Sequence, residues 1–325
     1  MSIFKLSEKE LEMYLKENID TKKPNELLEE LIECGLESGG VMEEIKEYVA
    51  KRKEQLKKQT NKEKALVIIQ VGNNPASNSY VKGKLSDCEE IGMKAMLLKY
   101  DEETIKDTET LIHIIEGLNK EERCAGIIVQ LPLPKYIDIK AVQLAIDPKK
   151  DVDGFHPMSE HTACTPLGVV NYLKNQGYKF EGKNALVIGR SDIVGKPLAQ
   201  LLLNENCTVT IAHSRTSKRD LKYYIQASDI VFTAIDKIEY FGTEYEEDFM
   251  YVPTVIDIGL GRNEQGKLKG NLSAELVEHI NALGNFVVSG TGGVGLLTRL
   301  QLLENTVNTQ REFKKNKESE GRGWN

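Results

Sequence analysis

The chain has 325 residues, of which 40% are hydrophobic and 29% charged, as is typical of a globular protein large enough for two domains. Its net charge of −7 at pH 7, without a basic face, argues against nucleic acid as a partner. No apolar stretch approaches the roughly 20 residues that span a membrane, and charges interrupt the N-terminus where a signal would lie. We therefore expect a cytoplasmic protein that does not bind membranes.

The N-terminal part of the chain carries only helical patterns. Residues 1–40 hold two short amphipathic patterns, one of them capped by Ser7, and a glycine pair ends them. A highly charged helix is expected over residues 41–58. These segments indicate a helical extension and give no sign of chemistry.

Strands and helices alternate from residue 65 onward. Residues 65–71 are apolar throughout, as in a strand that is covered on both faces. Further strands are predicted at residues 94–99 and 126–131, and helices at residues 78–91, 107–118 and 137–146. This alternation predicts an α/β fold with a largely parallel sheet.

A second α/β unit starts at Lys183, after an aperiodic linker at residues 151–166. Its strands are predicted at residues 185–188, 207–212, 229–234, 253–258 and 285–288, and its helices from about residue 195, at 272–282 and from about 296 to 309. The polar tail, residues 311–325, is expected to fray.

A glycine-rich turn follows the strand that ends at Ile188. Strand, glycine turn and helix form the context in which a dinucleotide phosphate binds at a helix N-terminus. Compared with G-x-G-x-x-G, the middle glycine after Gly189 is Ser191, and Gly195 comes one residue late. The Ser191 hydroxyl can donate a hydrogen bond to a pyrophosphate. As a motif this is weak, and a tight turn without a ligand stays open.

The next strand ends at a cation rather than an acid. In a βαβ unit this end meets the adenine ribose, where an acid suits NAD and a cation suits the 2′-phosphate of NADP. The chain offers Ser214 and Arg215 here, and Arg190 lies in the preceding turn. The pattern favours NADP over NAD, although Arg215 as a solvated surface charge remains the alternative.

Tyr80 and Lys84 lie four residues apart and so share one face of a predicted helix. A lysine beside a tyrosine at the mouth of a strand–helix unit can act as an acid/base if burial lowers its pKa. The simpler alternative is a surface pair whose aliphatic parts cover apolar neighbours.

Polar residues also lie at the end of the predicted strand at 126–131 and at the start of the linker. Gln130 falls at the carboxyl edge of a parallel sheet, where α/β sites lie, although it could equally bind a loop backbone. Asp151 and Asp153 point the same way along an extended segment. One of them could bind an amide-rich ring, and a turn or capping aspartate is the alternative.

Metal and nucleophile chemistry find little support. His156 and His161 have no cysteine or acid at zinc spacing, and five scattered cysteines (Cys34, Cys88, Cys124, Cys164 and Cys207) suit a reducing cytosol. No G-x-S-x-G elbow is present. We expect no metal.

Seven motifs occur in a characteristic order: Tyr80–Lys84, Gly126–Pro134, Lys150–Pro157, Gly189–Pro197, His213-Ser214, Gly292–Gly295 and Leu302–Thr306. Together they make the chain resemble the bifunctional methylenetetrahydrofolate dehydrogenase/cyclohydrolase family over roughly residues 41–310. Each motif alone is unspecific, whereas the combination is highly specific.

The resemblance implies two α/β domains with a cleft between them, the second a Rossmann-like NAD(P)-binding domain. Residues 41–155 with 296–310 would form the catalytic, folate-binding domain, and residues 156–295 the cofactor domain. Members oxidise 5,10-methylenetetrahydrofolate with NADP and hydrolyse the methenyl product to 10-formyltetrahydrofolate. A homodimer acting on tetrahydrofolate derivatives is expected.

The resemblance also implies roles for individual residues. Lys84 would be the acid/base of hydrolysis, tuned by Gln130. Tyr80 would stack against the folate, and Asp153 would anchor its pterin ring. Gly293 matches a further substrate-binding position. The cofactor site would comprise Gly189, Arg190, Ser191, Gly195, Ser214, Arg215 and Leu260.

Several positions depart from the family pattern. Asp236 replaces a glycine near the cofactor, and Gly270-Asn271 replaces the usual Gly-Asp. Residues 289–291 and Leu296 lack the usual prolines around the folate loop, and the linker is short. These departures keep two alternatives open: a cyclohydrolase with weak or absent dehydrogenase activity, and a non-catalytic folate- or nucleotide-binding paralogue.

Overall fold

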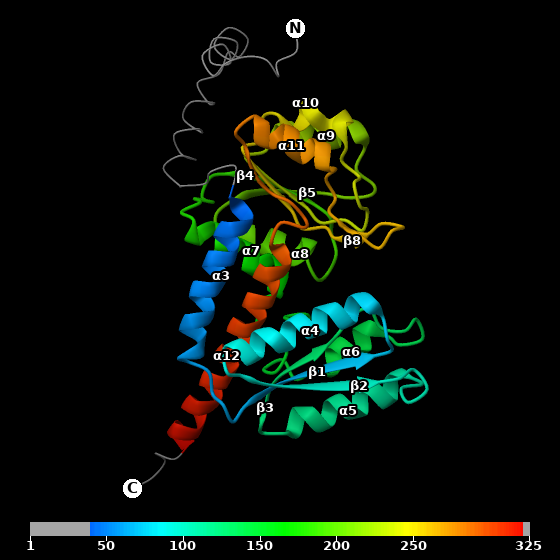
Figure 1. Ribbon diagram of the computed structural model, residues 1–325, viewed down its shortest axis with the longest axis vertical. Helices are drawn as coiled ribbons and strands as arrows, with labels where there is room; N and C mark the ends of the chain where they lie inside the picture. The colour runs from blue at the N-terminus through cyan, green and yellow to red at the C-terminus, as the bar shows by residue number, and fades with distance from the viewer. Residues whose placement is uncertain (1–39, 321–325) are drawn as a thin grey trace.

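The protein consists of two α/β lobes stacked along its long axis (Figure 1). The computed structural model describes residues 40–320, so the predicted helices before Gly40 and the last five residues lie outside the description. One lobe holds a three-stranded sheet of order β2-β1-β3, and the other a five-stranded sheet of order β10-β7-β6-β4-β5. All neighbouring strands in both sheets are parallel, as the alternation predicts.

The first lobe contains the predicted strands and helices, with ends shifted by a few residues. Its elements are α3 (Val41–Lys57), β1 (Ala65–Val71), α4 (Pro75–Glu90), β2 (Lys94–Tyr100), α5 (Thr108–Lys120), β3 (Cys124–Val129) and α6 (Ile139–Ala145). Leu66 and Ile68 of β1 face a core shared with α4, whereas Val67 and Ile69 face a core shared with α5 and α6. The central strand is therefore apolar on both faces, which explains its uninterrupted apolar sequence.

The second lobe adds several short elements that the sequence pattern did not reveal. It comprises α7 (Cys164–Asn175), β4 (Asn184–Ile188), α8 (Gly195–Asn204), β5 (Thr208–Ala212), α9 (Lys218–Gln226), β6 (Ile230–Thr233), η2 (Thr243–Tyr245), α10 (Glu246–Phe249), β7 (Thr254–Asp257), β8 (Gly261–Arg262), β9 (Leu268–Lys269), α11 (Ala274–Ala282) and β10 (Phe286–Val288). Because β5 and β6 flank β4 on opposite sides, the strand order reverses there. Dinucleotides bind at such a reversal.

The last helix, α12 (Val294–Glu320), runs from one lobe to the other beside α3 (Figure 1). It continues past residue 309, so the predicted helix end was too early. Asn305 Nδ2 donates a hydrogen bond to the carbonyl of Val152 at 2.9 Å, and Arg52 of α3 pairs with Glu304 at 2.6 Å. These contacts tie α12 to the first lobe. Within residues 40–320, no helix is long and apolar enough to cross a bilayer.

The contact between α7 and α12 depends on a missing side chain. A Cβ atom at Gly168 of α7 would lie 2.6 Å from the backbone oxygen of Leu297, well inside van der Waals contact. Because backbone cannot move as freely as a side-chain end, any larger residue would push the two helices apart.

We therefore expect Gly168→Ala to lower the free energy of unfolding by about 1–3 kcal/mol. Gly117→Ala in α5 is the matched control, since a Cβ there meets no atom within 4 Å. That change should be neutral or stabilise by up to about 1 kcal/mol. Urea unfolding of both variants checks the pair, and equal effects would contradict the steric explanation.

Candidate active site between the lobes

The lysine of the first lobe lies beside the glutamine that follows β3. Lys84 is 8% exposed, and its Nζ donates a hydrogen bond to Gln130 Oε1 at 3.1 Å. The Gln130 amide is fixed in turn, because its Nε2 donates to the carbonyl of Leu131 at 2.7 Å. The structure thus brings together two residues that lie 46 positions apart, with the glutamine oxygen turned toward the amine.

Tyr80 lies one turn before Lys84 on α4 and is partly buried. Burial raises the pKa of Tyr80, while the positive charges of Arg262 on β8 and Arg299 on α12 act to lower it. Two guanidinium groups therefore act on Tyr80 from outside α4, one of them from the second lobe. Such an environment suits an anionic substrate.

Arg299 reaches α4 through a notch in the helix. Its Nε lies 3.0 Å from Asp87 Oδ2, and its Nη1 occupies the space that a Cβ at Gly83 would take. Lys53 of α3 binds the other oxygen of Asp87 at 2.7 Å. Sequence reasoning missed this residue, because an arginine inside the apolar pattern of α12 gives no local sign of its partner.

The two aspartates after α6 have different roles. Asp151 is buried, and its carboxylate accepts hydrogen bonds from the backbone N–H groups of Gly154 at 3.1 Å and His156 at 2.7 Å. It is therefore the turn aspartate that the sequence left open. Asp153 is partly exposed, and its carboxylate accepts no hydrogen bond from the part of the chain that the structure describes. Of the pair, Asp153 remains available to a ligand.

Lys150 anchors this same turn from the other side. The side chain is 4% exposed, and its Nζ donates to the carbonyls of Leu118, Asn119 and Glu121 at 3.0, 2.7 and 2.9 Å. These carbonyls lie at the C-terminal end of α5, where a cation is favoured. No sequence pattern indicates this role, because the acceptors are backbone atoms about 30 residues away.

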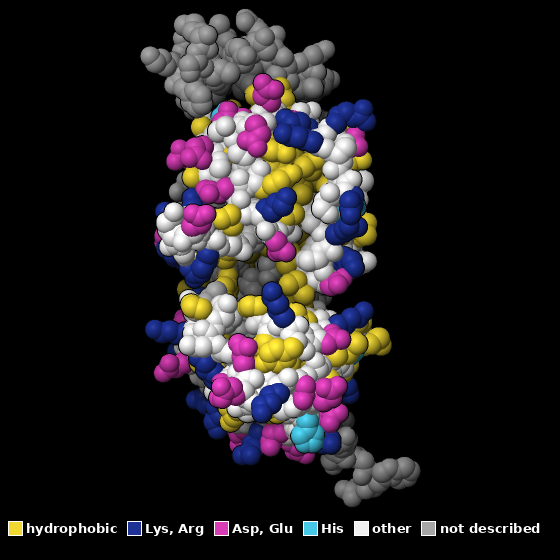
Figure 2. All heavy atoms as spheres, turned by 90° about the vertical axis from the view of Figure 1, so that its right-hand side faces the viewer, with side chains coloured by type: hydrophobic (Ala, Val, Ile, Leu, Met, Phe, Trp, Pro, Cys, Tyr) yellow, Lys and Arg dark blue, Asp and Glu magenta, His cyan; other side chains and the backbone are white. Residues whose placement is uncertain are grey.

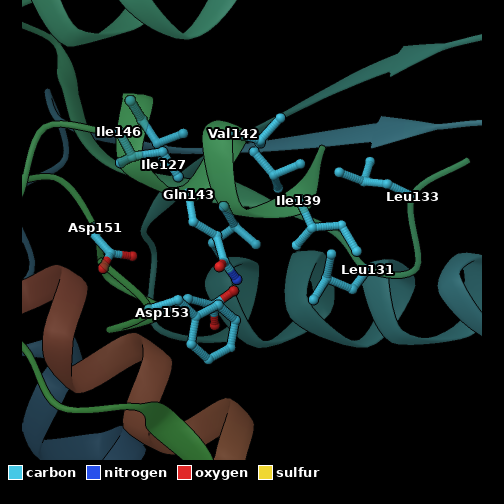
Figure 3. A pocket seen from close by; sticks show the side chains of 12 residues that line it. Ile127, Leu131, Leu133, Ile139, Val142, Gln143, Ile146, Asp151 and Asp153 are labelled. Carbon is cyan, nitrogen blue, oxygen red and sulfur yellow. The ribbon is translucent and has the colours of Figure 1, made fainter. Parts of the chain in front are cut away.

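A small apolar cavity lies next to the turn (Figure 3). Its lining includes Ile127, Leu131, Ile139 and Asp153, and its volume is about 10 Å³, room for about one water molecule. A bicyclic ring does not fit there. Figure 2 shows a separate hollow between the two lobes.

The glycine turn after β4 is built by close backbone contacts. Gly189 has a φ of +140°, and a Cβ there would lie 2.2 Å from the carbonyl oxygen of Ala234. A Cβ at Gly195 would lie 2.5 Å from the oxygen of Gly189. Ser191 Oγ accepts the N–H groups of Val194 and Gly195 at 3.2 and 3.3 Å, which leaves its hydroxyl proton to donate. Both glycines are thus required by the turn itself.

The cations predicted near the ribose are exposed at the same edge. Arg190, Ser214 and Arg215 are all exposed, and residues 213–217, after β5, contain no acid. Leu260 is partly exposed after β7. The tight turn and the free cations fit a dinucleotide with an additional phosphate.

A buried carboxylate joins the loops on this side. Asp257, at the end of β7, accepts hydrogen bonds from Thr233 Oγ1 at 2.8 Å, from the N–H of Asn271 at 3.0 Å and from that of Leu272 at 3.1 Å. Burial raises the pKa of Asp257 to about 6. Sequence reasoning missed Asp257, although a polar residue that ends a buried strand was the signal that pointed to Gln130.

Gly293 lies against α3 in the loop before α12. Its φ is +120°, and a Cβ there would lie 2.8 Å from Ile45 Cδ1.

Among residues 40–320, His, Cys, Asp and Glu form no group of three or more that could hold a metal. The candidate polar side chains of the first lobe are the amine of Lys84, the amide of Gln130, the phenol of Tyr80 and the carboxylate of Asp153.

Comparison with known families agrees with this geometry. Residues 36–153 match the tetrahydrofolate dehydrogenase/cyclohydrolase catalytic domain, and residues 163–314 match the NAD(P)-binding domain of the same family. The chain belongs to the tetrahydrofolate dehydrogenase/cyclohydrolase family. The bifunctional protein FolD of Lachnoclostridium phytofermentans is 40% identical over 286 residues, which cover 85% of this chain and 96% of that protein.

Solved structures of the same family superpose on both lobes. The bifunctional FolD of Campylobacter jejuni has a TM-score of 0.72 at 35% identity, covering 85% of this chain and 98% of that one. The FolD of Trypanosoma brucei, solved with NADP and an inhibitor, has a TM-score of 0.68 at 29% identity, covering 86% and 95%. The α/β fold with a second, NAD(P)-binding lobe is thereby confirmed.

We expect Lys150→Met to lower the free energy of unfolding by about 1–3 kcal/mol, because three backbone carbonyls at the end of α5 lose their donor. The turn that carries Asp153 should loosen at the same time. Lys149→Met, at an exposed neighbour, is the control and should have little effect. Urea unfolding checks the pair, and similar stabilities of both variants would disprove the anchoring role.

The Asp257 carboxyl should also leave a mark on the pH dependence of stability. Its pKa of about 6 in the fold lies above the value of about 3.9 in an unfolded chain, so the folded state binds more protons between these values. The contribution of this group is therefore greatest at low pH and is lost as pH rises through 6.

Comparison with Asp257→Asn isolates this group. The unfolding free energy of the wild type minus that of the variant should grow by about 1 kcal/mol as pH falls from about 7 to about 5. Urea titrations of both proteins at the two pH values measure this difference. A difference that stays constant, or shrinks, would contradict the raised pKa.

Proposed function

We propose that this protein oxidises 5,10-methylenetetrahydrofolate with NADP and hydrolyses the methenyl product to 10-formyltetrahydrofolate. The observation that carries the proposal is the Lys84–Gln130 hydrogen bond of 3.1 Å, which holds a largely buried amine at the carboxyl edge of the first sheet. In the second lobe, the glycine turn lies at the carboxyl edge of its own sheet. The hollow between the lobes then takes the substrate between amine and cofactor.

For the oxidation, the residues of the second lobe bind and orient the dinucleotide. NADP, when bound, accepts a hydride from the one-carbon bridge of the folate. Gly189, Ser191 and Gly195 form the turn for the pyrophosphate, while Arg190, Ser214 and Arg215 face the 2′-phosphate and Leu260 lines the site. Because hydride passes directly between two rings, the main task of the protein in this step is alignment.

For the hydrolysis, the first lobe supplies acid/base chemistry. The methenyl product is a cation and attracts water. The Lys84 amine accepts a proton from that water and returns it to the departing ring nitrogen, while Gln130 holds the amine in place. Asp153 offers its unpaired carboxylate to the N–H groups of the pterin, Tyr80 stacks on the folate, and Gly293 lines the same pocket.

The charges near Tyr80 suit the anionic tail of a folate. Arg262 and Arg299 act on Tyr80 from two different elements, and a glutamyl carboxylate is an anion that either can attract. They would raise the rate of capture despite the negative net charge of the chain.

The same proposal covers the organisation of the protein. Residues 41–155 with 296–310 form the folate-binding domain, and residues 156–295 form the cofactor domain. We expect the protein to be cytoplasmic. We also expect a homodimer, because β5 is an edge strand on which Ile211 is 41% exposed, and Leu203 of neighbouring α8 is 52% exposed.

Two assays on the full chain test the function. Formation of NADPH from 5,10-methylenetetrahydrofolate reports the oxidation, and decay of methenyl absorbance without NADP reports the hydrolysis. Both should be found. Hydrolysis alone would support a cyclohydrolase without dehydrogenase activity, and neither reaction would support a non-catalytic paralogue.

We expect Lys84→Met to lower the rate of methenyl hydrolysis by about 10²-fold or more, because the proton carrier is lost. NADPH formation should fall much less, since hydride transfer needs no group at that position. Lys82→Met, at an exposed lysine on the same helix, is the control and should retain both rates. Unchanged hydrolysis in Lys84→Met would remove the assignment of this residue.

A further inference from the structure

We propose that Arg299 is a positioning residue for methenyl hydrolysis, because its guanidinium group fills a notch in α4 at Gly83 and so fixes the helix that carries Lys84. The inference rests on the proposed function, in which the Lys84 amine accepts and returns the proton of the attacking water. Arg299 belongs to α12, so in this role it acts on the reaction through α4.

The notch exists because residue 83 has no side chain. A Cβ at Gly83 would overlap Nη1 of Arg299, and it would lie 3.0 Å from Cζ and 3.4 Å from Cδ of the same side chain. These are the three nearest atoms, so the guanidinium group lies directly on the backbone of α4. Lys84 is the next residue along this backbone and moves with it.

A carboxylate one turn further along α4 holds the guanidinium group in the notch. Nε of Arg299 lies 3.0 Å from Oδ2 of Asp87, whose side chain is 7% exposed. The other oxygen of Asp87 accepts a hydrogen bond from Nζ of Lys53, on α3, at 2.7 Å. Cations from two different helices therefore share one buried carboxylate, and a buried charge loses such a partner only at a high cost in free energy.

The notch and the site residues lie on adjacent faces of α4. Gly83 and Asp87 are four residues apart, as are Tyr80 and Lys84, so each pair forms a row along the helix. A rotation of α4 that moves the first pair away from α12 moves the second pair by the same angle. The hydrogen bond of 3.1 Å between the Lys84 amine and Gln130 depends on this angle.

Arg299 itself starts from a fixed part of α12. Leu297 and Gln301, on either side of it in the chain, lie against Gly168 of α7. A Cβ at Gly168 would lie 2.6 Å from the backbone oxygen of Leu297 and 3.4 Å from Cβ of Gln301. The helix therefore cannot approach α7 more closely, and the guanidinium group reaches α4 from a defined position.

The same helix also places the carboxylate proposed for the pterin ring. Asn305 of α12 donates a hydrogen bond to the carbonyl of Val152 at 2.9 Å, and Asp153 follows directly. Arg299 and Asn305 are less than two helical turns apart. Through these two side chains, α12 sets the spacing between the amine of Lys84 and the carboxylate of Asp153.

The test separates the contact from the charge of the arginine. Gly83→Ala keeps the charge of Arg299 but pushes its guanidinium group out of the notch. We expect kcat for methenyl hydrolysis without NADP to fall about tenfold, because a displaced acid/base group is less effective, while KM changes less than about twofold. Gly117→Ala in α5 adds a Cβ that meets no atom within 4 Å, so this control should leave both constants unaltered.

Removal of the guanidinium group gives a second variant. Arg299→Met should lower kcat to a similar extent, and adding Gly83→Ala to it should cause no further loss, because the alanine then meets no guanidinium group. Arg52→Met is the matched control. Arg52 of α3 pairs with Glu304 of α12 at 2.6 Å and otherwise bonds to its own helix, so its loss should keep kcat within about twofold of the wild type.

A measurement on the amine itself does not depend on turnover. In Gly83→Ala, Lys84 should react faster with N-hydroxysuccinimidyl acetate than in the wild type, because its amine leaves the hydrogen bond to Gln130. Peptide mass spectrometry follows the reaction, and the exposed Lys82 is the internal reference. If the wild type hydrolyses no methenyl substrate, the proposed function fails, and this labelling rate still decides whether the notch positions Lys84.

Three results would each overturn the inference. They are a kcat in Gly83→Ala within about twofold of the wild type, an equal labelling rate of Lys84 in both proteins, and losses that add up in the double variant. A change in KM alone in Arg299→Met would also contradict it, since the arginine would then serve only to capture an anionic substrate.

Discussion

A buried carboxylate on each lobe holds the loops that carry the candidate site residues. Asp151 accepts two backbone N–H groups of the turn after α6, and Asp257 accepts two of the loop before α11 together with the Thr233 hydroxyl. Asp257 ends β7, and Asp151 forms an isolated bridge beside Ile127 of β3. In both cases a short side chain next to a sheet replaces the hydrogen bonds that the loop cannot make to a neighbouring strand. Because the strands are rigid and buried, these hydrogen bonds hold the loops at a defined position relative to the sheets.

The two carboxylates resist ionisation for the same reason. Burial raises the pKa of Asp151 and of Asp257, while the N–H donors act in the opposite direction. Asp153 lies two residues from Asp151 and lacks such donors within the described chain. The loop therefore separates a structural carboxylate from one that stays free for a ligand.

The helix α12 contacts several of the elements that carry candidate site residues. Asn305 of α12 binds the carbonyl of Val152, between the two aspartates, and Arg299 of the same helix binds Asp87 on α4. One rigid element thus contacts the helix that carries Lys84 and the turn that carries Asp153. The N-terminus of α12 follows directly after Gly293. The helix therefore also fixes the position of the second lobe relative to α4 and to the turn that carries Asp153.

Much of the fold was predictable from local pattern, because parallel strands that are covered on both faces read as apolar runs between helical segments. The position of Gln130 at the carboxyl edge of the sheet was predictable in the same way, because it is the polar residue that follows such an apolar run. The choice between Asp151 and Asp153 was not predictable, since it depends on which carboxylate turns inward to the N–H of His156. Helix α7 was also missed, because Pro166 and Gly168 break the pattern that its packing against α12 requires.

Long-range partners explain the other residues that the sequence did not reveal. Lys150 and Arg299 both act on groups that are distant in sequence, and the partners of Lys150 are backbone atoms, which carry no residue-type signal. A lysine that caps a helix and a lysine on a surface look alike in a sequence. Only the fold tells them apart.

The loop before α12 makes tight turns without the prolines of the family pattern. Prolines are absent from residues 289–291 and from Leu296, yet the backbone N–H of Gly292 donates to the carbonyl of Ser289 at 2.7 Å, and that of Leu296 to Gly293 at 2.8 Å. A Cβ at Gly292 would lie 2.6 Å from Ser289 Oγ, so the turn closes tightly on the serine. Hydrogen bonds thus take over the restriction that proline rings would impose, at the expense of greater freedom in the unfolded chain. The glycines before α12, rather than the prolines, are what this loop requires.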